Sequence, residues 1–162
     1  LVMSAQSNCN VMDFLDGQID AIEKAVIKEV KLLYPFEKLL TVPGIGNILG
    51  MTIMLESGDM NRFQEVSNYS SYCRCVSSKK VSNGKKKGEN NKKNGNKYLA
   101  WAYVEAANFM RRFCQQARSW HQRKVSKTNQ IVATKALSNK IARACYFIIK
   151  DQTDFDPEML FE

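Results

Sequence analysis

Residues 74–97 place serine hydroxyls among a high density of positive charge, a combination that could act on a phosphate group. The segment contains Ser77, Ser78 and Ser82, and its single acid is Glu89. Its basic residues are Arg74, Lys79, Lys80, Lys85, Lys86, Lys87, Lys92, Lys93 and Lys97. A serine hydroxyl is a weak nucleophile that needs a base, a metal ion or strong local positive charge. Lysines beside Ser82 could bind a scissile phosphate and stabilise charge on its oxygens. Taken alone, the residue pattern still favours serines without a catalytic role.

The charge of the chain is concentrated in its central part. The net charge is +8, but residues 60–150 carry +17, whereas residues 1–59 carry −4 and residues 151–162 carry −5. A concentrated positive excess is typical of a surface that binds a polyanion. We therefore expect DNA or structured RNA as a partner, and a purely structural dimerisation domain fits this charge poorly.

The Gly, Asn and Ser residues of the lysine-rich segment leave few groups to bury. We therefore expect residues 74–97 to be a mobile basic loop, neither helix nor strand. Loops of this length inside compact domains are usually functional.

A second candidate for phosphate contact is the turn Pro43-Gly44-Ile45-Gly46 within residues 36–57. It separates a short apolar segment from a longer one, as in a helix-hairpin-helix element. Gly44 and Gly46 permit positive φ and allow the backbone to approach a phosphate, and the N–H groups of the following helix would face that anion. A Pro-Gly turn between two structural helices is the alternative, and we favour the phosphate contact.

The apolar periodicity predicts an all-α fold. A helix over Val11–Leu33 has a nearly heptad stripe, which fits a coiled-coil arm and packing within its own domain equally well. Long helices are expected at about 98–118 and 129–150, with the basic and aromatic residues 120–124 between them. We divide the chain into a connector helix (1–34), a main domain (35–150) and an acidic tail (151–162) that packs through its apolar residues or frays.

The cysteines favour free thiols over a disulfide framework, because they are five in number and scattered. Cys73 and Cys75 could supply two zinc ligands, but no second pair exists, so we favour two small structural residues. The lone His121 is interpreted as a packing or nucleic-acid-facing residue. Glu105 either orients a lysine or Ser82, or forms an ordinary ion pair, and the ion pair is favoured.

Three aromatic residues of the helix expected at 98–118, namely Tyr98, Trp101 and Tyr103, are interpreted mostly as core. Stacking of one of them on a base is the alternative. No run of eighteen apolar residues predicts a membrane helix. The chain begins at Leu1 without a signal sequence, and we expect a fragment of a longer, cytoplasmic protein.

Several motifs in fixed order resemble one family of mobile-element enzymes. They are Val42–Gly46, Glu56–Asp59, Arg62-Phe63, Tyr72–Val76, Ser82–Gly88 and Lys93–Ala102. Together they resemble the C-terminal transposase domain of the insertion-sequence 110 family, particularly its 1111 branch. The resemblance covers about residues 36–150, and the first helix resembles the family's coiled-coil connector.

The resemblance implies a function for Ser82. Full-length members resemble a two-part recombinase whose N-terminal, resolvase-like domain binds Mg²⁺ through four acids, while the C-terminal domain supplies a serine that attacks the DNA backbone. Ser82 matches that serine, although Asn83 follows it here in place of glycine, and Leu99-Ala100 replaces the common Leu-Arg. Members use a structured guide RNA, so the resemblance implies DNA and guide RNA as partners, a homodimer or higher oligomer, and a place at the bacterial nucleoid.

This chain alone is expected to be inactive, because none of its acidic residues form a cluster that could bind catalytic Mg²⁺. No cofactor is expected within the chain itself. The alternative function is a non-catalytic DNA- or RNA-binding module that uses the hairpin turn and the lysine-rich loop.

Overall fold

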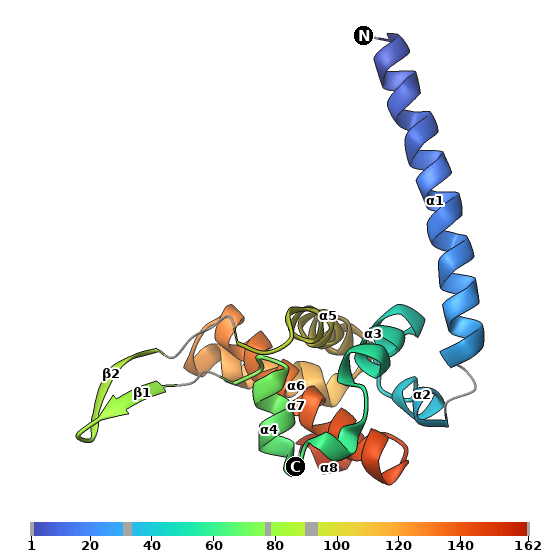
Figure 1. The fold of residues 1–162 in the computed structure, drawn as a ribbon. Helices are drawn as coiled ribbons and strands as arrows, with labels where there is room; N and C mark the ends of the chain where they lie inside the picture. The colour runs from blue at the N-terminus through green and yellow to red at the C-terminus, as the bar shows by residue number, and fades with distance from the viewer. Residues whose placement is uncertain (1, 31–33, 77–78, 90–93, 162) are drawn as a thin grey trace. The chain divides into compact units, whose positions relative to one another are not determined.

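The computed structural model describes residues 2–30, 34–76, 79–89 and 94–161. It divides into two units, Leu1–Leu33 and Tyr34–Glu162 (Figure 1). The first unit is the single helix α1, Val2–Val30. The predicted helix at Val11–Leu33 is therefore present but begins nine residues earlier, and residues 31–33 lie outside the described part. Its apolar residues Phe14, Ile19 and Ile22 are exposed.

The second unit is helical apart from one small sheet, so the predicted all-α fold is confirmed. Its elements are α2 Tyr34–Leu39, α3 Asn47–Ser57, the 3₁₀ turn η1 Met60–Arg62, α4 Val66–Tyr72, β1 Lys79–Ser82, β2 Lys85–Glu89, α5 Lys97–Phe113, α6 Gln115–Lys127, α7 Gln130–Asp151 and α8 Pro157–Phe161. Helix α7 contacts α2, α4, α5 and α6. It is therefore the helix around which the second unit packs.

Asparagine side chains fix the beginnings of the two longest helices of this unit. The Asn96 side chain accepts hydrogen bonds from the N–H groups of Tyr98 and Leu99 at the start of α5. The Asn129 side chain accepts one from the Val132 N–H at the start of α7. Each side chain satisfies helical N–H groups that have no partner within the helix.

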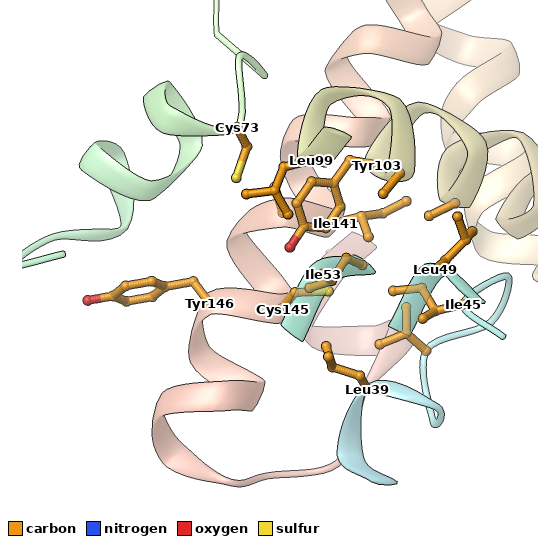
Figure 2. Close-up of a cluster of buried hydrophobic side chains, with 14 of the residues drawn as sticks. Leu39, Ile45, Leu49, Ile53, Cys73, Leu99, Tyr103, Ile141, Cys145 and Tyr146 are labelled. Carbon is orange, nitrogen blue, oxygen red and sulfur yellow. The ribbon is translucent and has the colours of Figure 1, made fainter. Parts of the chain in front are cut away.

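The core lies where α3, α5 and α7 meet. Figure 2 shows Leu49 and Ile53 of α3, Leu99 and Tyr103 of α5, and Ile141 of α7 pointing into one apolar cluster. Burying a large apolar side chain contributes roughly 1.5–3 kcal/mol relative to leaving it in water. These contacts join segments far apart in sequence and are what holds the helices together.

A chain of hydroxyl groups crosses this core. The Tyr69 hydroxyl lies 2.6 Å from the Tyr103 hydroxyl and 2.8 Å from the Ser57 hydroxyl. All three residues are buried, and the bonds connect α4, α5 and α3. Burial raises the pKa of both tyrosines well above the usual value, so the network is neutral and structural.

The prediction of one helix over 98–118 was wrong. Helix α5 ends at Phe113, Cys114 has an extended backbone (φ −117°, ψ 119°), and α6 begins at the next residue. The Arg118 guanidinium donates hydrogen bonds to the carbonyls of Arg111 and Arg112, which satisfies acceptors at the end of α5. Residues 120–124, expected between two helices, accordingly lie inside α6. A break of one residue leaves the apolar periodicity almost unchanged, so the sequence pattern did not reveal it.

The prediction of a loop over residues 74–97 was also wrong for residues 79–89, which form an antiparallel hairpin (Figure 1). Asn83 and Gly84 both have left-handed backbones, with φ of 51° and 71°. That geometry is the type I′ turn, whose twist matches that of the two strands, and an Asn-Gly pair is its strongest sequence signal. The loop was predicted from the lysine-rich composition, which does not take account of this two-residue turn signal.

The acidic tail packs on the helical body. The Phe155 N–H donates to the Thr41 Oγ1 at 2.9 Å, and the Lys38 ammonium forms an ion pair with Asp154 at 2.9 Å. At the end of the chain, Phe161 of α8 contacts Trp120 of α6. The tail therefore contacts both α6 and the end of α2.

Candidate nucleic-acid interface

The hairpin places Ser82 at the end of β1, directly before its turn. Ser82 is paired in register with Lys85, the first residue of β2. Directly opposed residues of an antiparallel pair point to the same face, with their Cβ atoms about 4.5–5.5 Å apart. Ser82, Lys85 and Lys87 are all exposed. The hydroxyl and an ammonium group thus share a solvent-facing surface that a phosphate can reach.

The other predicted lysines are distributed around this hairpin. Lys79 and Lys80 lie in β1, and Lys86 lies in β2. Lys97 is the first, exposed residue of α5. Lys92 and Lys93 lie outside the described residues. An irregularity of the register between Lys80 and Val81 leaves two residues of β2 opposite one of β1, as in a β-bulge, which increases the local twist.

The single histidine of the chain is committed to packing between α6 and α7. His121, the single histidine, is buried on α6, where its Nε2 lies 3.1 Å from the Thr134 hydroxyl of α7. Burial and then the charge of Arg111 lower its pKa, so His121 is neutral at neutral pH and serves packing. Within residues 2–30, 34–76, 79–89 and 94–161, no three His, Cys, Asp or Glu side chains are grouped to hold a metal ion.

The two turn glycines have different surroundings. Gly44 has φ of 93°, and a Cβ at this position would lie 2.6 Å from the Met110 nitrogen and 2.9 Å from the Ala106 oxygen of α5. Glycine is therefore required here for close packing of the turn on α5. Gly46 has an ordinary extended backbone (φ −96°) with open space around it. The backbone thus uses a positive φ at Gly44 and not at Gly46.

The N-terminus of α3, next to Gly46, is open to solvent. Gly46 occupies the N-cap position without a side-chain cap, and Gly46, Asn47 and Ile48 are exposed. The first N–H groups of a helix have no partner within it and carry partial positive charge. A phosphate could therefore reach the N-terminus of α3, as predicted for Gly46. Gly44 instead packs against α5.

The comparisons with known proteins bear directly on this region. Residues 36–122 match the family model described as the IS116/IS110/IS902 transposase family. The match covers more than half of the chain. The chain belongs to this transposase family.

A relative from Pseudomonas aeruginosa, described as a probable family 20 transposase, is 26% identical over 147 residues. The alignment covers 88% of this chain and 44% of the relative. The chain thus spans less than half the length of the relative it matches.

The match to the transposase family extends from α2 into α6 and includes the α2–α3 turn and the hairpin. Every predicted site residue, from Gly44 to Lys97, therefore lies in the part of the chain that matches the family model. Helix α7 lies beyond the match, although it completes the core of this transposase domain. No helix of the described residues has the length and apolarity needed to cross a bilayer.

The transposase domain has a second group of cations, which lies outside the predicted site. They lie on α5, α6 and α7, and are Arg111, Arg112, Arg118, Arg123, Lys124, Lys127, Lys135, Lys140, Arg143 and Lys150. These cations contribute to the net charge of +17 of residues 60–150, but a net charge does not indicate on which helix face they lie. Arg118 is committed to the carbonyls at the end of α5.

The thiols of the transposase domain are structural. Cys73, Cys75, Cys114 and Cys145 are buried, and Cys9 of α1 is exposed. Burial raises the pKa of the Cys75 thiol to about 11 and that of the Cys145 thiol to about 12. A thiol must be deprotonated to bind a metal ion or to act as a nucleophile, so these groups are held in the inert form.

The sequence interpretation of Tyr98 and Trp101 as core residues was wrong. Both are exposed on α5, whereas Tyr103 is fully buried as expected. Glu105, on the same helix, is half-buried and forms no ion pair with a described basic residue. The favoured ion-pair interpretation of Glu105 therefore finds no support among the described residues.

Proposed function

We propose that this chain is the DNA-binding, serine-nucleophile domain of an insertion-sequence transposase. The observation that carries the proposal is the position of Ser82. It is exposed, it directly precedes a tight turn, and it is paired with Lys85 in the region that matches the family model. A hairpin of this kind presents its turn residues to a partner while its strands fix their direction.

In the proposed reaction the Ser82 Oγ forms a bond to the phosphorus of a DNA phosphodiester. The bond from that phosphorus to a deoxyribose oxygen breaks, and the proton of the serine hydroxyl is passed to the leaving oxygen. Lys85 and Lys87 bind the phosphate and stabilise the negative charge that develops on its oxygens. The group that moves the proton is expected in another part of the full-length protein, together with its Mg²⁺ site.

DNA binding in this proposal uses two further elements. The α2–turn–α3 segment acts as a helix-hairpin-helix whose uncapped α3 N-terminus binds a backbone phosphate. The cations of α5, α6 and α7 add electrostatic attraction that is independent of base sequence. A structured guide RNA, the 1111 branch of the family and an oligomeric full-length protein belong to the same proposal, as does action at the nucleoid.

A covalent trap tests the nucleophile. The full-length transposase is incubated with a nicked DNA substrate, and the protein–DNA adduct is mapped by mass spectrometry. We expect the adduct on Ser82, and we expect Ser82→Ala to abolish strand exchange while DNA affinity changes less than about twofold, since the substitution removes no charge. The matched controls are Ser77→Ala and Ser78→Ala, which should retain most activity. An adduct on another residue, or recombination by the Ser82→Ala variant, would refute the assignment.

One observation favours a second function, a non-catalytic DNA- or RNA-binding module. Lys85 and Lys87 of the hairpin and the uncapped N-terminus of α3 are exposed, and phosphate binding at these two places needs no nucleophile. In that case the Ser82→Ala variant would retain full recombination, while charge reversal of the hairpin would still weaken binding.

A further inference from the structure

Helix α5 has an exposed strip of aromatic side chains that runs beside its buried face. Tyr98 is 52% exposed, Trp101 48% and Phe109 38%. Because successive residues of an α-helix are rotated by about 100°, these three positions fall within roughly a quarter of the helix circumference. Figure 2 shows Leu99 and Tyr103 of the same helix pointing into the core. Hence α5 buries one apolar face and leaves a second one uncovered.

Cations accompany the rings of this strip. The Lys97 ammonium lies 4.8 Å from the centre of the Tyr98 ring, and the Arg112 guanidinium lies 5.5 Å from the centre of the Phe109 ring. Neither cation forms an ion pair with a described carboxylate. Glu105 is the acid of the strip. Positive charge at both ends makes this face complementary to a polyanion that also offers flat apolar groups.

The strip adjoins a second anion-binding feature. A Cβ at Gly44 would lie 2.9 Å from the Phe109 Cβ, so the α2–α3 turn packs against the Phe109 end of the strip. Gly46, two residues further, is the uncapped start of α3. The Phe109 end of the strip, with Arg112, therefore lies beside the turn that leads into the N-terminus of α3.

We infer that this face of α5 binds a segment of nucleic acid with unpaired bases, which stack on Trp101 and Tyr98. Its phosphates contact Lys97, Arg112 and the start of α3. Unpaired bases expose the flat π-faces that stack on aromatic side chains, whereas a duplex hides them. Charge complementarity decides for nucleic acid over a second protein helix, because a purely apolar partner would leave the cations of the strip unpaired. The inference rests on the proposed function in that the chain binds nucleic acid.

The test uses tryptophan fluorescence of the complete chain. The Trp120→Phe variant leaves Trp101 as the single tryptophan. It is titrated with oligothymidylate or oligouridylate of about 20 nucleotides, and with a duplex of about the same length. We expect strong quenching of Trp101 by the single strands and little by the duplex. The matched control is Trp101→Phe, which leaves only Trp120, half-buried against Phe161 of α8, and should show little change.

Binding affinities give the second readout. Trp101→Ala should weaken single-strand binding about tenfold, equivalent to about 1.4 kcal/mol, and leave duplex binding and urea stability nearly unchanged. Trp101→Phe should retain most of the affinity. A difference between the two single strands identifies DNA or RNA as the source of the unpaired segment.

Absence of Trp101 quenching, or an equal loss on duplex and single strand, would overturn the inference while leaving the proposed function intact. A changed oligomeric state of Trp101→Ala by sedimentation, with unchanged binding, would assign the face to a protein contact. Failure of the wild-type chain to bind any of the probes would refute the proposed function together with the inference.

Discussion

The hairpin of β1 and β2 and the helical body of α2–α7 obtain their structure in different ways. The hairpin is organised locally, by two left-handed residues that reverse the chain and by one register of neighbouring strands. The helical body is organised by contacts between distant segments, such as the hydroxyl pair of Tyr69 and Tyr103, which are 34 residues apart. A two-stranded hairpin alone is at best marginally stable in water, whereas a buried core is cooperative.

This difference separates function from stability in the sequence. The residues proposed for chemistry lie on the hairpin, where the exposed side chains contribute little to the core. The residues that hold the fold lie on α3, α5 and α7. Substitutions in the helical body should therefore lower the stability, whereas substitutions of the hairpin lysines should weaken nucleic-acid binding and leave the stability nearly unchanged. The following changes test that separation.

The largest effect on stability is expected from Gly44→Ala. The new Cβ would lie 2.6 Å from a backbone nitrogen of α5, at a φ of 93° that alanine rarely adopts. We expect a loss of about 3 kcal/mol or more in the free energy of unfolding, measured by urea titration. The matched control is Gly46→Ala, which faces open space and should cost no more than about 1 kcal/mol, the usual penalty of alanine at an N-cap. Equal losses for the two variants would show that the turn is not fixed by its contact with α5.

The largest effect on binding is expected from reversing Lys85, Lys86 and Lys87 to Glu. Each lost phosphate contact lowers the slope of log affinity against log salt by about 0.9, so three contacts predict a change of about 2.7. Affinity for all DNA sequences should fall alike, because phosphate contacts carry no sequence information. Fluorescence anisotropy across a salt series measures both quantities.

The control for this change reverses Lys24 and Lys28 on α1, both exposed, and should leave the slope nearly unchanged. The free energy of unfolding of the hairpin variant should also stay within about 0.5 kcal/mol of the wild-type value. A loss confined to one DNA sequence, or a destabilised core, would contradict the separation of the two regions.

The smallest effect is expected from Asn83→Val, which acts on the hairpin alone. A β-branched residue at φ of 51° is strained by about 1–3 kcal/mol, enough to open a marginal hairpin. NMR should show loss of the cross-strand contact between Ser82 and Lys85, while amide exchange in α5 and α7 stays slow. Asn83→Gly, which tolerates this backbone, should preserve the contact. Faster exchange in the core of Asn83→Val would mean that the hairpin supports the helical body.

The sequence by itself determined the features that depend on local pattern. Apolar periodicity predicts the helical class and α1, α3 and α7, because a helix repeats its buried face every three to four residues. The ordered motifs indicate the family, and the net charge of the central block indicates a polyanion partner. The Asn83-Gly84 pair is also a local signal for the hairpin, because a turn of two successive left-handed residues needs no distant contact. The lysine-rich composition around it nevertheless led to the prediction of a loop.

Only the tertiary structure decided which surface each of these elements presents. The apolar periodicity could not show that α5 occupies the space that a side chain at Gly44 would need. It also could not show that Tyr98 and Trp101 face solvent while Tyr103 is buried. It could not reveal the break at Cys114, which Arg118 stabilises from the next helix. In each case the outcome depends on a partner segment distant in the chain or across a turn, and burial is a property of packed pairs of elements and not of one helix.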